Sequence, residues 1–304
     1  MNQKFIEELK QAAGERQVLT KEPMKKHTTF RIGGEADYFI MPQTKEALGA
    51  VVDLCKKATV PWHIIGNGSN LLVGDKGVRG AVIQLFKNFS AVCVEGNVLT
   101  AQAGAINSLV AKQALDHGLT GFEFASGIPG TIGGAVVMNA GAYGGEMKDV
   151  LLEATVLTAE GDFITLPKEA MRLGYRTSIV AEQKYIVVEV KLQLQPGDPK
   201  EISARMEELK VRRVTKQPLE FPSAGSTFKR PEGYFAGKLI MDAGLRGFTV
   251  GGAQVSEKHC GFVINANEAT AADVVSLMEQ VCQKVYEKFG VRLEPEVKKL
   301  GEFE

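Results

Sequence analysis

The hydrophobic pattern of the chain changes its period along the sequence, which predicts a mixture of helices and strands. Apolar residues recur every four positions at Phe5, Leu9 and Ala13 and end at a glycine, as in a short amphipathic helix. Thr44 can cap a second helix that runs to Ala58. Two longer helical patterns follow at residues 200–214 and 271–289.

Strand patterns fill most of the remaining chain. Gly96-Asn97 separates two β-rich runs, and residues 159–162 separate another pair that we expect to form a hairpin. Asn107 is expected to cap a helix over residues 108–117. The predicted strands cover residues 62–65, 81–85, 91–95, 98–103, 153–157, 163–166, 185–194 and 259–266. With strands and helices in this order, the chain is predicted to be a globular α/β or α+β protein.

Composition and charge narrow the class of partner. The chain has 304 residues, 44% of them apolar, so it is long enough for two or three domains. Lys+Arg and Asp+Glu both number 36, which leaves no net field to attract nucleic acid or an anionic membrane. We therefore expect a small-molecule partner.

The termini, cysteines and histidines suggest a cytoplasmic protein without a metal. The first helix carries Glu7 and Glu8 and lacks the apolar core of a signal peptide, and no window is apolar enough for a membrane span. The four cysteines have no C-x-x-C spacing, and the four histidines are dispersed. Reduced cysteines in or near the core and no metal site are therefore expected.

Residues 126–145 contain seven glycines in twenty positions, alternating with small side chains. Such a segment lets backbone N–H groups approach a flat or anionic ligand without interference from a Cβ. Pro129 stiffens one turn, and Thr131 offers a hydroxyl. Tight turns between ordinary strands are the alternative. The glycine density favours a cofactor-binding surface.

A second glycine loop, Gly66-Asn67-Gly68-Ser69-Asn70, follows a predicted strand. It nearly matches the dinucleotide fingerprint G-x-G-x-x-G, but Leu71 replaces the third glycine and another strand-like segment follows. A Rossmann domain is therefore disfavoured. The loop suits a strand-turn-strand nest for a phosphate, with a plain Asn-Gly hairpin turn as the alternative. Residues 233–238 also miss the P-loop spacing, which argues against ATP.

Polar side chains lie beside turns in three distant segments, at Arg176, Ser226 and Glu296. Taken singly, each is typical of an ordinary surface residue. Ser226 lacks a Gly-x-Ser-x-Gly elbow and an identifiable histidine base, so a serine hydrolase is disfavoured. The residues by themselves predict a cofactor-binding enzyme with a separate C-terminal domain after the helix breaker at residues 216–218.

Together, seven motifs resemble one known family in the same order along the chain. The family is UDP-N-acetylenolpyruvoylglucosamine reductase, also called UDP-N-acetylmuramate dehydrogenase, a flavoenzyme of bacterial peptidoglycan synthesis. One motif would be a weak signal, but the combination is highly specific. The matching motifs are residues 29–34, 66–70, 127–134, 139–144, 174–176, 224–229 and 294–297.

This resemblance implies an α+β fold. It would consist of an FAD-binding domain of the vanillyl-alcohol-oxidase (PCMH) type, in two subdomains, and a C-terminal α+β domain that binds the substrate. The implied boundaries are residues 1–80 for the first subdomain, 81–215 for the second and 216–293 for the substrate domain, with residues 294–304 returning to the first. The chain resembles the shorter form of the family, which lacks a tyrosine-bearing loop over the substrate.

The resemblance also implies a reaction and its catalytic residues. NADPH would reduce non-covalently bound FAD, which then reduces the enolpyruvyl group of the UDP-sugar. The family's catalytic residues fall on Arg176, Ser226 and Glu296. Arg176 suits the charge that develops on the substrate carboxylate, and Ser226 would deliver a proton to the α-carbon. Glu296 would hydrogen-bond the same carboxylate if burial raises its pKa and keeps it protonated.

Further residues are expected to bind the cofactor and the substrate. The first glycine loop is assigned to the FAD pyrophosphate and the longer glycine segment to the flavin ring. The expected cofactor ligands are Gly66, Asn67, Gly68, Ser69, Asn70, Gly127, Ile128, Pro129, Gly130, Thr131, Gly133, Gly134, Asn139, Gly141 and Ala142. The expected substrate ligands are Tyr175, Arg213, Lys216, Lys229, Arg230 and His259.

Two other functions remain open from the sequence. One is another FAD-dependent oxidoreductase of the same fold, and the other is a non-catalytic protein that binds UDP-sugars. A visible absorption spectrum, followed by addition of NADPH and then substrate, would separate them. We expect a monomer.

Overall fold

The computed structural model describes residues 2–303, which divide into two compact units. Unit 1 comprises the chain up to Leu19, Tyr38–Asn67 and Ala81–Arg213. Unit 2 comprises Thr20–Asp37, Gly68–Gly80 and the chain from Val214 onward. The three-domain boundaries expected from the sequence stay predictions.

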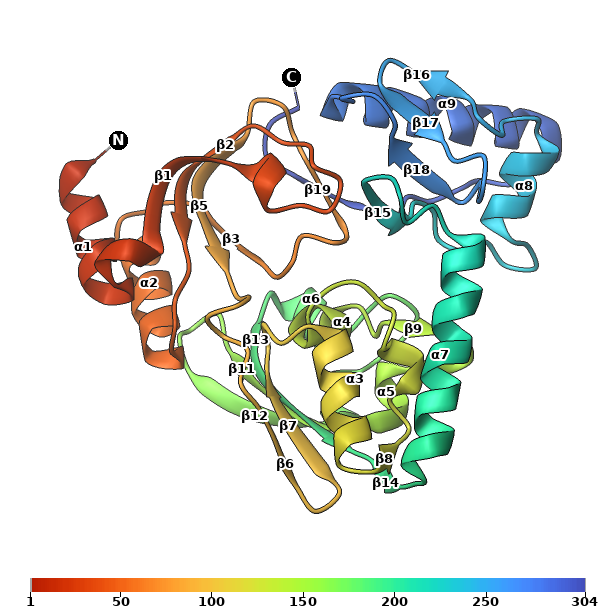
Figure 1. The fold of residues 1–304 in the computed structure, drawn as a ribbon. Helices are drawn as coiled ribbons and strands as arrows, with labels where there is room; N and C mark the ends of the chain where they lie inside the picture. The colour runs from red at the N-terminus through yellow and green to blue at the C-terminus, as the bar shows by residue number, and fades with distance from the viewer. Residues whose placement is uncertain (1, 304) are drawn as a thin grey trace. The chain divides into compact units, whose positions relative to one another are not determined.

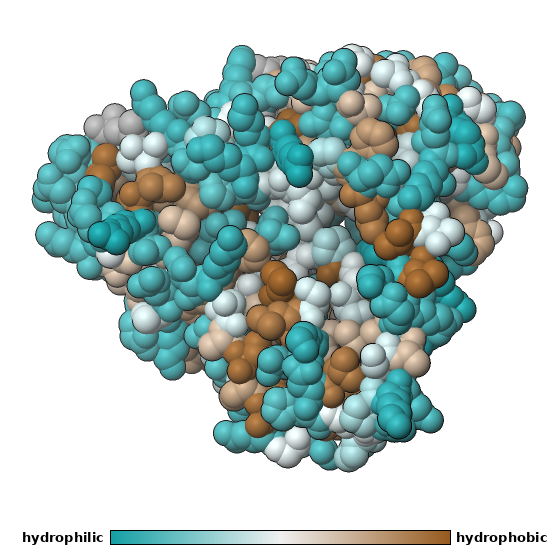
Figure 2. All heavy atoms as spheres, viewed as in Figure 1, coloured by the Kyte–Doolittle hydropathy of each residue, from teal (hydrophilic) through white to brown (hydrophobic). Residues whose placement is uncertain are grey.

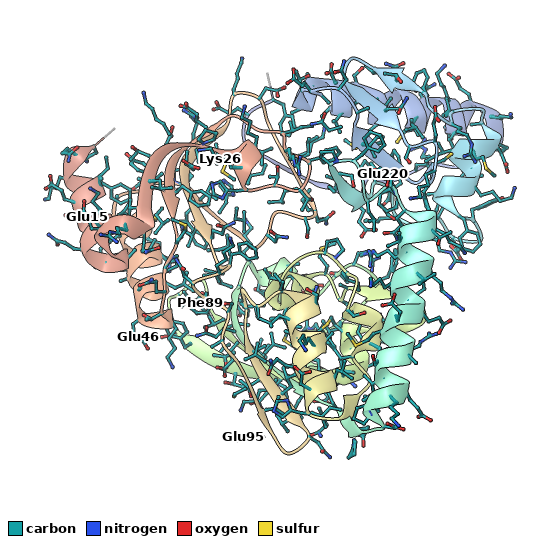
Figure 3. All side chains as sticks on the ribbon, in the orientation of Figure 1. Glu15, Lys26, Glu46, Phe89, Glu95 and Glu220 are labelled. Atoms are coloured by element: carbon teal, nitrogen blue, oxygen red, sulfur yellow. The ribbon has the colours of Figure 1, made fainter. Side chains whose placement is uncertain are left out.

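Unit 1 contains a five-stranded antiparallel sheet (Figure 1). Short turns join β6 to β7 and β11 to β12, and the second pair forms the hairpin expected from residues 159–162. Figure 3 places Glu95 at the tip of the β6–β7 hairpin. In spatial order the strands are β12 (Phe163–Pro167), β11 (Leu151–Leu157), β13 (Ile186–Gln193), β7 (Val98–Gln102) and β6 (Val92–Glu95).

Several helices belong to unit 1. At α2 the Thr44 hydroxyl accepts a hydrogen bond from the Ala47 amide, so Thr44 is the expected cap. In α1 the buried positions are Phe5, Leu9 and Ala13, as the hydrophobic spacing predicts. The helices within unit 1 are α1 (Gln3–Ala13), α2 (Lys45–Lys57), α3 (Asn107–Asp116), α4 (Ile132–Val137), α5 (Met147–Val150) and α6 (Ile179–Gln183). A longer helix, α7 (Pro199–Lys216), ends in unit 2.

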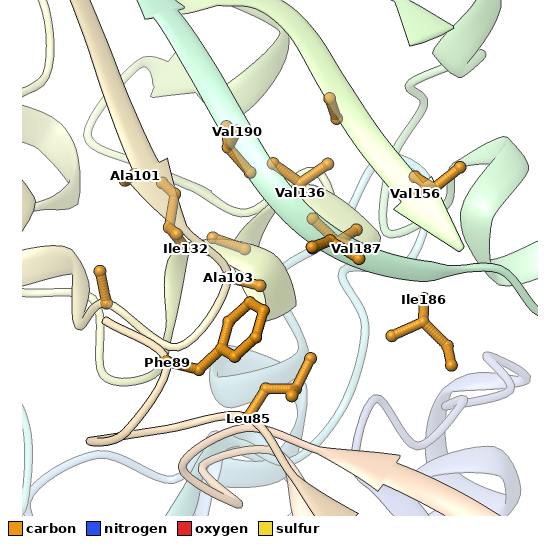
Figure 4. Packing of buried hydrophobic residues seen from close by; sticks show 14 of the residues in the cluster. Leu85, Phe89, Ala101, Ala103, Ile132, Val136, Val156, Ile186, Val187 and Val190 are labelled. Carbon is orange, nitrogen blue, oxygen red and sulfur yellow. The ribbon is translucent and has the colours of Figure 1, made fainter. Parts of the chain in front are cut away.

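The core of unit 1 lies between its sheet and the helices. Val187 and Val190 of β13 pack with Ile132 and Val136 of α4, and the ring of Phe89 packs into the same cluster (Figure 4). Phe89 is 1% exposed. Burial of such side chains is worth roughly 1.5–3 kcal/mol each, which anchors α4 on the sheet.

Three smaller strand groups complete the pairing around unit 1. One is a four-stranded sheet whose spatial order is β1 (Val18–Pro23), β2 (Glu35–Ile40), β5 (Val78–Gln84) and β3 (Trp62–Ile65). The other two are two-stranded: β8 (Leu119–Thr120) pairs with β14 (Gln195–Pro196), and β9 (Gly141–Ala142) pairs with β10 (Gly145–Glu146). Within the four-stranded sheet, β3 pairs with β5 in parallel.

Unit 2 has its own hydrophobic core and a four-stranded sheet (Figure 1). Its long helix α9 (Ala271–Phe289) begins with a capping box at Thr270 and ends at Gly290, whose φ of 68° suits glycine. The remaining elements are β15 (Ser223–Ser226), β18 (Phe262–Asn265), β17 (Ala253–Val255) and β16 (Thr249–Val250) of the sheet, α8 (Ala236–Asp242), and the parallel pair β4 (Leu71–Val73) and β19 (Lys298–Leu300).

Two details of the sequence prediction are wrong. The cap of α3 is Ile106, and Asn107 is the first helical residue, where its side-chain Nδ2 instead donates to the Ile128 carbonyl (3.3 Å). The strand expected over residues 259–266 begins at Phe262, because the residues before it form a turn in which the Phe262 amide bonds to His259.

Polar residues dominate one face of the molecule. On the face shown in Figure 2, hydrophilic residues cover most of the area and hydrophobic residues form small groups among them. Within residues 2–303, no helix is both long and apolar enough to cross a membrane.

Candidate flavin and substrate site

The glycine-rich segment of unit 1 is held in place by backbone hydrogen bonds. The amides of Ile132 and Gly133 donate to the carbonyls of Ala105 (2.8 Å) and Ala103 (2.9 Å), and the Asn107 amide donates to Gly130 (3.1 Å). Residues 103–107 follow strand β7, so the sheet fixes the position of the segment. The short helix α4 inside this segment was not predicted from the sequence.

Two neighbouring glycines of this segment have different surroundings. A Cβ on Gly133 would lie 2.8 Å from the Cβ of Ala103, so Gly133 permits close packing against the sheet. A Cβ on Gly134 would meet nothing closer than the Thr131 hydroxyl, at 3.6 Å, and Gly134 is exposed. The surface at Gly134 is therefore free of side chains and suits the close approach of a flat group.

The two glycine loops meet within unit 1. A Cβ on Gly66 would overlap the hydroxyl of Thr131, so the first loop lies directly against the N-terminal end of α4. The buried side chain of Gln84 donates to the Gly66 carbonyl (3.0 Å). Gln84 was not predicted from the sequence to belong to the site. The only hint of such a role in the sequence is a single amide side chain within an otherwise apolar strand. The adjoining glycines and the Thr131 hydroxyl fit a planar, phosphate-bearing cofactor.

The second half of the first loop belongs to unit 2 and touches a different expected residue. Gly68 has a φ of 63°, and the Thr29 amide donates to its carbonyl (3.3 Å). The side-chain Nδ2 of Asn70 donates to the carbonyl of Glu296 (3.4 Å). Asn70 thus lies beside a predicted catalytic residue.

Ser226 and Glu296 lie on adjacent segments of unit 2. The Glu296 amide donates to the Thr227 carbonyl (2.8 Å), and Phe228 and Pro295 form an antiparallel bridge next to it. Ser226 is exposed at the end of β15, and Glu296 is half-buried. The structure therefore places the backbone segments of two of the three predicted catalytic residues side by side. The two residues joined by the amide hydrogen bond, Thr227 and Glu296, are 69 positions apart in the sequence.

Hydrogen bonds of Thr227 hold these two segments in place. This role of Thr227 was not predicted from the sequence. Thr227 is 1% exposed, and its hydroxyl accepts a hydrogen bond from the Val263 amide (2.8 Å). Its own amide donates to Gly261 (2.8 Å). Bonds on both sides of Thr227 therefore set the position of Ser226 relative to Glu296.

Arg176 lies in unit 1, in a tight turn between Gly174 and Thr177 that is closed by two backbone hydrogen bonds. Its φ of 58° is in the left-handed region, which is strained for a residue with a side chain. The guanidinium carbon lies 5.0 Å from the centre of the Tyr175 ring, a cation–π distance. Tyr175, an expected substrate ligand, is 57% exposed.

The cationic residues expected to bind substrate fall into two groups. Arg213 is in unit 1 and is placed against Gly127, and burial lowers the pKa of its guanidinium. In unit 2, burial and, to a lesser extent, the charge of Lys216 lower the pKa of His259. The Nδ1 atom of His259 accepts from the Gly261 amide (3.1 Å), which places its proton on Nε2 when the ring is neutral.

Lys229 and Arg230 directly follow the segment that contains Ser226. The Lys229 amide donates to the Glu294 carbonyl (2.8 Å), and its Nζ lies 3.1 Å from the carboxylate of the same glutamate. The guanidinium carbon of Arg230 is 4.0 Å above the ring of Phe235, and its Nε donates to the Tyr234 carbonyl (3.3 Å). These contacts hold two cations close along the chain to Ser226.

The described residues offer no group of three or more His, Cys, Asp or Glu side chains that could hold a metal ion. The cysteines of residues 2–303 are reduced, and burial raises the pKa of the Cys55 thiol to about 11.

Comparisons with known proteins match both parts of the chain. A family model described as "FAD binding domain" matches residues 36–167, and one described as "UDP-N-acetylenolpyruvoylglucosamine reductase, C-terminal domain" matches residues 217–300. The chain is 55% identical to the UDP-N-acetylenolpyruvoylglucosamine reductase of Agathobacter rectalis over 100% of both chains.

Solved structures give the same result. A crystal structure of UDP-N-acetylenolpyruvylglucosamine reductase from Thermus caldophilus matches with a TM-score of 0.80 and 36% identity, covering 93% of this chain and 98% of that chain. An alkyldihydroxyacetonephosphate synthase matches with a TM-score of 0.50 and 18% identity over 64% of this chain and 41% of that chain, which is a likeness of fold alone. These matches confirm the predicted α+β fold with a PCMH-type FAD-binding domain.

Proposed function

Because this chain belongs to the UDP-N-acetylenolpyruvoylglucosamine reductase family and is an FAD-dependent oxidoreductase of peptidoglycan synthesis, we propose that it uses NADPH to reduce UDP-N-acetylglucosamine enolpyruvate to UDP-N-acetylmuramate. The observation that carries the proposal is the pairing of the Ser226 and Glu296 segments in unit 2. The sequence alternative of a non-catalytic UDP-sugar binding protein is excluded by the family.

The chain's own residues hold the cofactor. The backbone around Gly134, with Thr131 and Gly66 beside it, provides the side-chain-free surface for FAD, and Asn67 to Asn70 continue the loop proposed for the pyrophosphate. When bound and reduced by NADPH, FAD would supply the hydride that adds to the β-carbon of the enolpyruvyl group.

Arg176 and Glu296 act on the substrate carboxylate. Addition of hydride leaves negative charge on the α-carbon, delocalised into the adjoining carboxylate. The fixed cation of Arg176 stabilises this charge, and its planar fork suits a carboxylate better than an ammonium group would. The backbone of Glu296 is fixed by Thr227 and Asn70. With a proton on its carboxyl group, Glu296 would donate a hydrogen bond to the same carboxylate.

Ser226 donates the proton that completes the reaction. A serine hydroxyl is a weak acid, so it protonates only a strongly basic carbon such as this one. Its exposed position at the end of β15 leaves it accessible to a substrate. General acid catalysis by a positioned group contributes about 10² to 10⁴ in rate.

The cations of unit 2 bind the rest of the UDP-sugar. Lys229 and Arg230 follow Ser226 by three and four residues, so a fully extended chain would place Arg230 at most about 14 Å away from it. Lys216 supplies a further cation of the unit, and His259 supplies an Nε2–H donor. We assign these four residues to the negatively charged diphosphate and its neighbouring sugars.

The proposal is tested by following the flavin absorbance of the purified holoenzyme without oxygen. NADPH is expected to bleach the yellow colour, and UDP-N-acetylglucosamine enolpyruvate is expected to restore it with formation of one equivalent of product. Bleaching that the enolpyruvyl substrate does not reverse would contradict the proposed reaction and favour a different oxidoreductase of this fold. A lack of bleaching by NADPH, with bleaching by NADH, would overturn the choice of reductant.

A further inference from the structure

The side chain of Asn139 links two segments that the proposed function treats separately. Asn139 follows helix α4, is 1% exposed and has a φ of 42°, a left-handed conformation that asparagine tolerates better than most residues. Its Nδ2 donates to the carbonyl of Gly174 (3.1 Å) and to the carboxylate of Glu146 (2.6 Å). Its Oδ1 accepts from the Lys148 amide (2.9 Å).

These bonds use both donors of the amide and one acceptor site, all within unit 1. The Lys148 ammonium lies 2.5 Å from the second oxygen of the Glu146 carboxylate and helps to orient it. A buried amide with partners on three sides has one rotamer and one orientation available. The side chain of Asn139 is therefore a rigid bridge.

Gly174, at one end of this bridge, begins the turn that carries Arg176. The turn is closed by hydrogen bonds between Gly174 and Thr177, and Arg176 has its strained backbone conformation inside it. At the other end of the turn, the fully buried Ser178 donates its hydroxyl proton to the Val137 carbonyl (2.8 Å). Both ends of the turn are thus tied to the C-terminal end of α4.

We propose that Asn139 is a positioning residue that sets the place of Arg176 for its action on the substrate carboxylate. The inference rests on the proposed catalytic role of Arg176. It gives the Asn139 side chain a task other than direct contact with FAD, since its donors are directed to Gly174 and Glu146. The same helix that presents Gly134 at its N-terminal end thereby also fixes the catalytic arginine from its C-terminal end.

Two variants separate the amide from the backbone. Asn139→Gly keeps the left-handed backbone accessible and removes the bridge. Asn139→Asp keeps the shape and the acceptor for Lys148 but directs a carboxylate oxygen at Gly174 and Glu146. Asn88→Gly is the matched control, because Asn88 is an exposed loop residue of the same unit and bonds to the Gln17 side chain.

Misplacement of a catalytic group by about 1 Å can cost about 10²-fold in rate. For both Asn139 variants we therefore expect reoxidation of the reduced holoenzyme by the enolpyruvyl substrate to slow by about 10²-fold. Bleaching by NADPH and the dissociation constant of FAD should stay within about threefold of wild type. Amide hydrogen exchange over residues 174–178 should be faster in the variants and unchanged in Asn88→Gly.

A double-mutant cycle tests whether Asn139 acts through Arg176. In an Arg176→Gln background, which already lacks the cation, Asn139→Gly should slow reoxidation no further. Additive losses, equal slowing of both half-reactions, loss of FAD or unchanged reoxidation in Asn139→Gly would each overturn the proposal. If wild type itself is not reoxidised by the enolpyruvyl substrate, the proposed function fails first, and that result is distinct from any result with the variants.

Discussion

The glycine segment of unit 1 (residues 126–145) and the adjacent segments of unit 2 that carry Ser226 and Glu296, called here the Ser226–Glu296 strip, form binding surfaces in opposite ways. In the first, the backbone forms the surface, and glycine is needed where another chain segment comes close, as at Gly133 against Ala103. In the second, short backbone bonds fix the strand segments while the polar side chains stay accessible, as at Ser226. A planar cofactor requires the first kind of surface and a charged sugar nucleotide the second.

The two regions are therefore expected to respond differently to substitution. Added atoms in the glycine segment either overlap a fixed neighbour, as at Gly133, or occupy open surface, as at Gly134, so their cost falls on folding or on cofactor binding. Removal of a side chain from the strip leaves the backbone intact, so its cost falls on rate or on substrate affinity.

The largest effect is expected for Ser226→Ala. The hydroxyl is exposed at the end of β15, so its removal should leave the fold and FAD binding unaltered. Reoxidation of the reduced enzyme by the enolpyruvyl substrate should slow by at least about 10²-fold, or about 3 kcal/mol, while NADPH bleaches the flavin at a near normal rate. Stopped-flow absorbance measures both steps. Unchanged reoxidation would remove Ser226 from the acid role.

Gly133→Val and Gly134→Val should differ although the two residues are neighbours. The first substitution forces a branched side chain against Ala103 and should cost about 1–3 kcal/mol of stability, measured by urea unfolding of the apoprotein. The second meets open space in the apoprotein, so its stability should be nearly normal. Its FAD dissociation constant should instead rise by at least about tenfold, or about 1.4 kcal/mol. Equal losses of stability in both variants would contradict the distinction.

Helices and strands with a regular hydrophobic period, or with a capping residue at one end, were predictable from the sequence. Helix α2 has the expected cap, because Thr44 bonds to an amide in its own first turn and needs no distant contact. Asn107 was wrongly predicted to be the cap of α3, because its side-chain amide instead donates to the Ile128 carbonyl, a tertiary contact with no local signal in the sequence. Its Oδ1 is buried without a hydrogen-bond partner among residues 2–303.

The candidate site was predictable as a set of motifs and not as a set of contacts. Glycine density marks a backbone surface, but the sequence cannot separate Gly133 from Gly134, because only the fold places Ala103 beside the former. Thr227, Gln84 and the bridging amide of Asn139 gain their roles from segments far away in the sequence. The individual site assignments stay predictions until the variants are measured.

Lys229→Met tests the charged strip with a smaller effect. Lys229 is partly exposed and already paired with Glu294, so the net worth of its charge to a bound diphosphate is limited. We expect the KM for the UDP-sugar to rise about three- to tenfold, with kcat nearly unchanged and a weaker dependence of KM on salt. Lys210→Met is the control, because Lys210 is exposed and its ammonium pairs only locally, with Glu207. An equal change in both variants would remove Lys229 from the binding site.

The smallest effect concerns pH. Burial, with a further contribution from Lys216, lowers the pKa of His259 below its ordinary value of about 6.5. The unfolded chain therefore binds this proton more readily than the folded one, so the contribution of His259 to stability is present above pH 6.5 and is lost as the pH falls through the lower folded value. In Lys216→Met the imidazole, followed by NMR, should titrate at a higher pH than in wild type, and the loss of stability between pH 7.5 and 5.5 should shrink. An unchanged titration would show that the charge of Lys216 does not reach the ring, and would separate this lysine from His259 in the diphosphate site.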